Sequence, residues 1–106
     1  DAGVGGSVAV ALAAVLADLA KTHQVIVVTH LAQVAVRGER HFMVKKTAGA
    51  TGNESEGANA AEAAIPETTL CELGEDERVR EIARMLSGDA SEASLTHAKE
   101  MLKNVR

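Results

Sequence analysis

The first third of the chain combines a helical hydrophobic pattern with a continuous apolar run. Large apolar residues recur at helical spacing between residues 8 and 19, with alanines between them, and predict an amphipathic helix that ends near residues 22–23. The apolar stripe consists of Val8, Leu12, Val15, Leu16 and Leu19. Residues 24–29 then read Gln-Val-Ile-Val-Val-Thr, a β-branched run typical of a strand buried on both faces of a parallel sheet.

The middle of the chain predicts a short helix and a hairpin. Residues 31–36 form the short helix, and the alternating residues 41–47 form a strand. Residues 48–65 are rich in Gly, Ala, Asn, Glu and Thr and offer little to bury, so we expect a mobile loop that cannot offset its ordering entropy. Residues 68–73 predict a returning strand, which makes an antiparallel hairpin with the strand before the loop.

Residues 75–106 predict two C-terminal helices. The first begins with three carboxylates, which suit the positive end of the helix dipole, and a Ser-Gly-Asp sequence ends it. Either Asp89 or Ser91 caps the second helix. The apolar stripes consist of Val79, Ile82, Ala83 and Leu86 in the first helix, and of Leu95, Ala98, Leu102 and Val105 in the second. The order of elements predicts an α/β fold, in which the buried strand needs parallel neighbours that this chain scarcely supplies.

Composition and charge narrow the function classes. The 106 residues carry 15 acidic and 11 basic side chains, a net charge of −4, and their single aromatic residue is Phe42. A basic stripe for phosphates and aromatic platforms for bases are both missing, so we expect weak DNA binding by this segment itself. The lone Cys71 cannot form an internal disulfide, which fits a reducing, cytoplasmic setting. Asp18 interrupts the longest apolar run, and we expect no membrane partner.

One candidate for chemistry is His30, which follows the predicted buried strand. Ligands of open α/β sheets bind outside the carboxyl ends of the strands, and an imidazole there can donate a hydrogen bond to a phosphate. The alternative is that His30 caps the strand or satisfies a nearby carbonyl.

Another candidate is the glycine-rich run that opens the chain. It consists of Asp1, Ala2, Gly3, Val4, Gly5 and Gly6. Before a helix, such a run can cradle an anion, but it matches neither a dinucleotide fingerprint nor a P-loop. Taken alone, the run is more typical of a flexible connector than of an anion site, and its place at the start of the chain suggests a fragment of a longer protein.

The sequence contains no recognisable set of metal ligands and no recognisable catalytic nucleophile. The histidines His23, His41 and His97 do not share ligand spacing with Cys71, so we expect no metal site. No serine lies in a recognisable nucleophile turn.

Several segments together resemble the C-terminal part of the ATPase head of the RecN family. They are the glycine-rich run 1–6 and residues 27–35, which read Val-Val-Thr-His-Leu-Ala-Gln-Val-Ala. Residues 78–88 and 98–102 are similar to the family's closing E-x-A-R-x-L-x-G and A-K-E-L-L segments, so the resemblance covers the whole chain. RecN proteins are bacterial double-strand-break repair proteins related to the SMC proteins, with an ABC-type, P-loop ATPase head.

The resemblance implies roles for individual residues. Asp1 would be the last residue of the family's D-E-V-D run, so the catalytic glutamate would lie just upstream of this chain. Residues 1–6 would form the D-loop region, which lies near the nucleotide of the partner head. His30 would be the switch histidine that contacts the γ-phosphate, and Gln33 belongs to the same signature.

The resemblance also implies cofactors and partners. ATP and Mg²⁺ would bind the intact protein, with Mg²⁺ held mainly by groups outside this segment. Because the sequence contains no P-loop lysine, signature loop or coiled coil, we expect no hydrolysis and no cofactor for the fragment alone. The partners would be the remainder of the same polypeptide, a second head in a homodimer, and DNA through other parts, in the bacterial cytoplasm at the nucleoid.

Two positions depart from the family pattern. Ala32 stands where the family commonly has Pro, which predicts a looser turn after His30. Gly5 stands where related SMC heads carry an Asp, so the side-chain contact from that position would be missing. A rival hypothesis makes the chain a non-catalytic interaction module that docks through residues 48–65 and the C-terminal helices.

Overall fold

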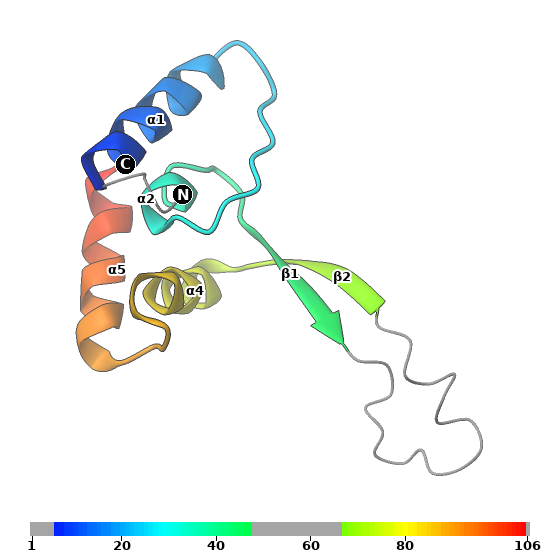
Figure 1. The fold of residues 1–106 in the computed structure, drawn as a ribbon, viewed down its shortest axis with the longest axis vertical. Helices are drawn as coiled ribbons and strands as arrows, with labels where there is room; N and C mark the ends of the chain where they lie inside the picture. The colour runs from blue at the N-terminus through cyan, green and yellow to red at the C-terminus, as the bar shows by residue number, and fades with distance from the viewer. Residues whose placement is uncertain (1–5, 48–66, 106) are drawn as a thin grey trace. The chain divides into compact units, whose positions relative to one another are not determined.

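The computed structural model describes residues 6–47 and 67–105 (Figure 1). The glycine-rich run up to residue 5 and the predicted mobile loop lie outside the described residues. The elements are α1 (Gly6–Leu19), α2 (Ala32–Ala35), β1 (Phe42–Thr47), β2 (Glu67–Glu72), α4 (Glu75–Ser87) and α5 (Glu92–Asn104). They belong to two compact units, a helical unit of residues 1–41 and 74–106 and a hairpin unit of residues 42–73.

The core of the helical unit lies among α2, α4 and α5. Ile82 and Ala83 of α4 are completely buried, as is Ala98 of α5. The remaining buried members of this cluster are Ala32, Val36 and Leu102. The predicted stripes of the two C-terminal helices are therefore confirmed, because each helix turns its apolar side to the other and to α2.

The ends of α4 and α5 follow from local hydrogen bonds. Glu77 Oε1 accepts a hydrogen bond from the Gly74 amide at 2.9 Å, which satisfies one amide at the start of α4. Gly88 ends α4 with a φ of 88°, a left-handed conformation that glycine adopts without steric cost. Ser91, rather than Asp89, caps α5, since its Oγ accepts a hydrogen bond from the Ser94 amide at 3.2 Å.

Helix α1 forms as predicted, but the side that it buries is different. Ala9 and Ala13 are buried, whereas Val8 and Val15 are 55% and 64% exposed, and Leu12 and Leu19 are also exposed. The prediction that the stripe of large residues is buried is therefore wrong for this chain. The reason is packing: α1 contacts α2 through its small alanine side chains, and no described element covers its large ones.

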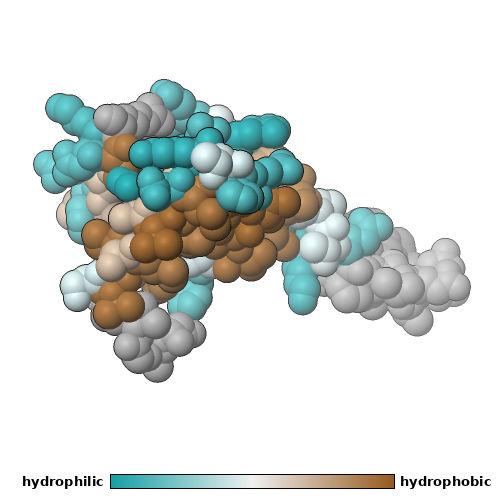
Figure 2. Space-filling model, turned by 90° about the horizontal axis from the view of Figure 1, so that it is seen from above, coloured by the Kyte–Doolittle hydropathy of each residue, from teal (hydrophilic) through white to brown (hydrophobic). Residues whose placement is uncertain are grey.

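The predicted buried parallel strand is also absent from the described residues. Residues 24–29 form no strand, and Ile26 and Val28 are 84% and 94% exposed. A strand needs a neighbour for its backbone hydrogen bonds, and the described part of the chain places none beside this segment. In the view of Figure 2, apolar side chains gather over part of the surface of the helical unit.

The hairpin unit confirms the two predicted strands. β1 pairs with β2 in antiparallel register, and Val44 lies opposite Leu70. On the same face, Phe42 and Lys46 lie opposite Glu72 and Thr68. The alternate face carries Met43 and Cys71, both half-buried, while Phe42, Val44 and Leu70 are exposed. None of the described helices is long and apolar enough to cross a bilayer.

Candidate functional site

His30 lies in a tight turn between the extended segment and α2. The Leu31 amide donates a hydrogen bond of 2.9 Å to Thr29 Oγ1, so the Thr29 side chain closes the turn around His30. Thr29 is half-buried, whereas His30 is exposed. The turn therefore places His30 at the surface of the helical unit. The sequence placed this histidine at the end of an apolar run, and the structure keeps it there without the predicted strand.

Gln33 lies on α2, one turn after His30. Leu31, with extended backbone, begins this helix, and the Val34 and Ala35 amides both donate to the Leu31 carbonyl at 3.0 Å. Gln33 is half-buried and lines a hollow of about 200 Å³ together with Val10, Ala13 and Ala14 of α1 and residues of α5. The structure thus places Gln33 beside the same hollow as α1, the helix that follows the glycine-rich run.

The members of the glycine-rich run are largely outside the described residues. Asp1, Ala2, Gly3, Val4 and Gly5 are not described, and Gly6 is the first residue of α1. A Cβ added at Gly6 would meet no atom within 4 Å, so its place is not explained by close packing. Neither the hollow beside Gln33 nor the cavity lined by Arg78 includes His30 or Gly6 in its lining, so neither gathers His30, Gln33 and Gly6 together.

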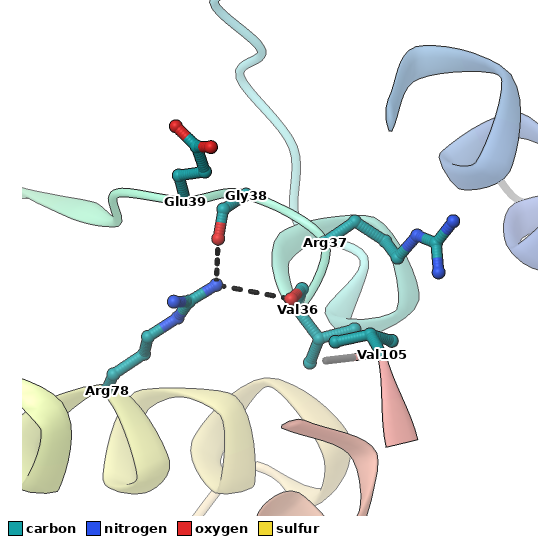
Figure 3. Close-up of a pocket in the computed structure, with 6 residues that line it drawn as sticks. All are labelled: Val36, Arg37, Gly38, Glu39, Arg78 and Val105. Atoms are coloured by element: carbon teal, nitrogen blue, oxygen red, sulfur yellow. Dashed lines mark hydrogen bonds between the residues drawn. The ribbon is translucent and has the colours of Figure 1, made fainter. Parts of the chain in front are cut away.

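Arg78 is a buried residue that the sequence analysis did not single out. It is 8% exposed, and its Nη2 donates to the carbonyls of Ala35 at 3.1 Å, Val36 at 3.2 Å and Gly38 at 2.5 Å. Figure 3 shows the side chain reaching from α4 to the carbonyls of Val36 and Gly38. Arg78 therefore holds the chain where it leaves α2, the helix that carries Gln33.

A sequence signal for Arg78 existed. Arg78 precedes Ile82 by four residues, so it shares the apolar face of α4, where a cation must be buried with partners or lie at the rim of the core. Helix C-terminal carbonyls are suitable partners because the last turn leaves them without intrahelical donors. An arginine on an apolar helix face could therefore have indicated a buried contact, although the pattern does not identify the acceptor.

The cavity beside Arg78 has a volume of about 280 Å³ and does not form an anion site. The cavity is lined by Arg78 together with Val36, Arg37, Gly38, Glu39 and Val105 (Figure 3). Arg37 and Glu39 point away from the Arg78 guanidinium in this view. Since Nη2 of Arg78 already donates to backbone carbonyls, an entering phosphate would compete with those bonds. We therefore assign Arg78 to the architecture of the α2 turn rather than to a ligand.

His41 adds a titratable group near Arg78. Its Nδ1 atom is buried and has no hydrogen-bond partner among the described residues. Burial lowers the pKa of His41, the positive charge of Arg78 lowers it further, and the carboxylate of Glu81 acts in the opposite direction. Glu81 also binds Arg84, with 2.9 Å between Arg84 Nε and Glu81 Oε1. His41 is therefore held in its neutral form to a lower pH than a solvent-exposed histidine.

The lowered pKa of His41 predicts a loss of stability on acidification. In the unfolded chain, His41 is protonated near its ordinary pKa of about 6.5, whereas in the folded chain it is protonated only at a lower pH. The free energy of unfolding should therefore fall as the pH drops through about 6.5 and level off below the folded pKa. Urea unfolding at pH 7.5 and 5.5 should show a smaller loss for His41→Gln than for the unaltered chain. His97→Gln, at an exposed position of α5, is the control, and an equal acid loss in His41→Gln and the unaltered chain would contradict the assignment.

The described residues do not fit a metal site. No group of three or more His, Cys, Asp or Glu side chains is placed to hold a metal ion in the part of the chain that the structure describes.

Comparison with known proteins finds close relatives over nearly the whole chain. The chain is 46% identical over 102 residues to the DNA repair protein RecN of Deinococcus radiodurans, an alignment that covers 96% of this chain. It is 42% identical over 107 residues to RecN of Streptomyces coelicolor and 38% identical over 104 residues to RecN of Treponema pallidum. These alignments cover 100% and 97% of the chain, and no family model matches it.

The relatives are much longer than this chain. In each of these three alignments, the chain spans 16% of the relative's own length. The identity therefore concerns one segment, and the properties of a whole protein do not follow from it directly.

Proposed function

We propose, from the premise that this chain is a segment of a RecN-type DNA repair protein, that it forms part of an ATP-binding and ATP-hydrolysing head. The head would act in recombinational repair of DNA double-strand breaks, with ATP bound between two heads. The remainder of the polypeptide supplies the phosphate-binding loop, the Mg²⁺ ligands and the contacts to DNA. The segment alone is inactive.

The observation that carries this proposal is the exposed turn at His30. A side-chain hydrogen bond closes the turn, and His30 lies exposed in it at the end of an extended apolar segment. Negative charge develops on the transferring phosphoryl group, and a positioned donor lowers the barrier by stabilising that charge. His30 is the group in this segment that contacts the γ-phosphate.

Gln33 and residues 1–6 have supporting roles in this proposal. Gln33 lies beside the same hollow as α1, so a change at the His30 turn is transmitted to the helix that follows the D-loop region. Bound ATP supplies the phosphoryl group, while the residues of this chain orient it and couple the two heads. The rival interaction module receives less support, because the apolar sides of α4 and α5 already form the core of the helical unit.

Amide hydrogen exchange in a full-length protein that contains this segment tests the proposal. ATP with Mg²⁺ should slow exchange in residues 30–38, because a ligand that contacts His30 reduces the opening of the turn and of the one-turn helix after it. Residues 92–98 in the first half of α5, which do not line the hollow of Gln33, serve as the internal reference. Unchanged exchange in residues 30–38 at saturating ATP would contradict a nucleotide contact from this turn.

A further inference from the structure

Helix α2 cannot hold its own conformation. It consists of four residues, Ala32–Ala35, and an isolated helix of one turn is unstable in water. Its side chains join the core through Ala32 and Val36, but the backbone that follows turns away immediately at Gly38. The Gly38 amide donates to the Ala35 carbonyl at 3.2 Å, but the other carbonyls of this exit need donors from elsewhere in the chain. Arg78 provides them from 40 to 43 residues away in the sequence.

We propose that Arg78 is a positioning residue for the ATPase reaction, acting through the turn that carries His30 and Gln33. By donating to the carbonyls of Ala35, Val36 and Gly38, it fixes the C-terminal end of α2 against α4. The N-terminal end of the same helix begins at Leu31, directly after His30. With both ends fixed, the imidazole has one orientation relative to the core. This inference rests on the proposed function of His30.

The planar guanidinium fixes the direction from which one nitrogen of Arg78 reaches these carbonyls. One nitrogen, Nη2, contacts three carbonyls that belong to a turn of four residues, and its two hydrogens must be shared among them. The guanidinium presents its donors in a rigid plane, whereas a lysine ammonium is a flexible point charge with strong hydration. A lysine at this position keeps a cation near the carbonyls but loses the fixed direction. Arg78→Lys should therefore retain the fold and only part of the activity.

The experiment uses a full-length protein that contains this segment. Steady-state ATP hydrolysis and thermal midpoints are compared for Arg78→Met, Arg78→Lys, His30→Ala and the double variant His30→Ala with Arg78→Met. Arg80→Met is the matched control, because Arg80 lies on the same helix two residues later and is exposed. Activity is measured well below the lowest midpoint and expressed per folded molecule.

Arg78→Met should lower kcat about tenfold to a hundredfold, since a misplacement of about 1 Å can reduce a rate about a hundredfold. KM should change little. Arg78→Lys should fall between this variant and the unaltered protein, and Arg80→Met should match the unaltered protein. In the His30→Ala background, Arg78→Met should have almost no further effect, because residues that act through one another are not additive.

The outcomes separate this inference from the proposed function. If His30→Ala hydrolyses ATP normally, the proposed function fails. If His30→Ala is impaired while Arg78→Met has a normal kcat, only the positioning role of Arg78 fails. The same role fails if adding Arg78→Met to His30→Ala lowers kcat by the same factor as Arg78→Met does alone. If Arg78→Met does not fold, the same comparison of kcat is made with the single variant Arg78→Lys and the double variant His30→Ala with Arg78→Lys.

Discussion

His30→Ala in the full-length protein should reduce ATP hydrolysis about a hundred- to a thousandfold. Removing one preformed donor to a developing charge costs on the order of 2.7–4 kcal/mol in the barrier. The thermal midpoint should change little, because His30 is exposed and the turn around it is closed by Thr29 and Leu31. Steady-state ATPase and thermal unfolding on the same preparations, with and without DNA, measure both quantities.

The alternative role of His30 makes the opposite forecast. If the imidazole only satisfies a local backbone group, its removal should cost about 1–3 kcal/mol of stability and leave turnover per folded molecule unchanged. His97→Ala is the control, since His97 is also an exposed histidine of the helical unit and lies on α5. A His30→Ala protein that melts early and turns over normally would contradict a nucleotide contact.

Ile82→Ala should be the most destabilising single substitution in the core of this chain. Ile82 is completely buried among α2, α4 and α5, and truncation of such a side chain costs about 2–5 kcal/mol through lost burial and the cavity that remains. Unfolding of the 106-residue chain in urea should show this loss as a lower midpoint with an unchanged slope.

Ile26→Ala is the matched control for that measurement. Ile26 is 84% exposed in this chain, so the same chemical change should alter the free energy of unfolding by less than about 0.5 kcal/mol. Comparable losses at Ile26 and Ile82 would show that the segment of residues 24–29 is packed in this chain and would contradict its exposure.

The sequence predicted those elements whose partners lie within the chain. The stripes of α4 and α5 face each other and α2, and the alternation in β1 and β2 finds its partner strand across the hairpin. For such elements, local periodicity and the tertiary environment agree. The same agreement explains why the end of α4 at Gly88 could be placed from residue types, whereas the choice between Asp89 and Ser91 as the cap of α5 needed the structure.

The errors concern elements whose apolar side chains find no cover within the described chain. A β-branched run such as residues 24–29 predicts burial, but the pattern does not identify the neighbour that buries it. Helix α1 shows the same effect, since its alanine face meets α2 while Val8 and Val15 stay exposed.

The site could be predicted only in part. The position of His30 followed from the sequence, whereas the contact of Arg78 with residues 35–38 depends on how α4 packs against α2. Roles for residues 1–6 and Gln33 stay predictions, because they depend on a ligand between two heads.

The exposed apolar side chains of the helical unit have a thermodynamic consequence. They are Val8, Val10, Leu12, Val15, Leu19, Ile26, Val27 and Val28. Any surface that covers them releases hydration water, so its association should carry a negative heat-capacity change. The attraction should then weaken on cooling, because the entropic gain from released water fades at low temperature. Self-association of this chain and its binding to other apolar surfaces should accordingly be weakest in cold solution.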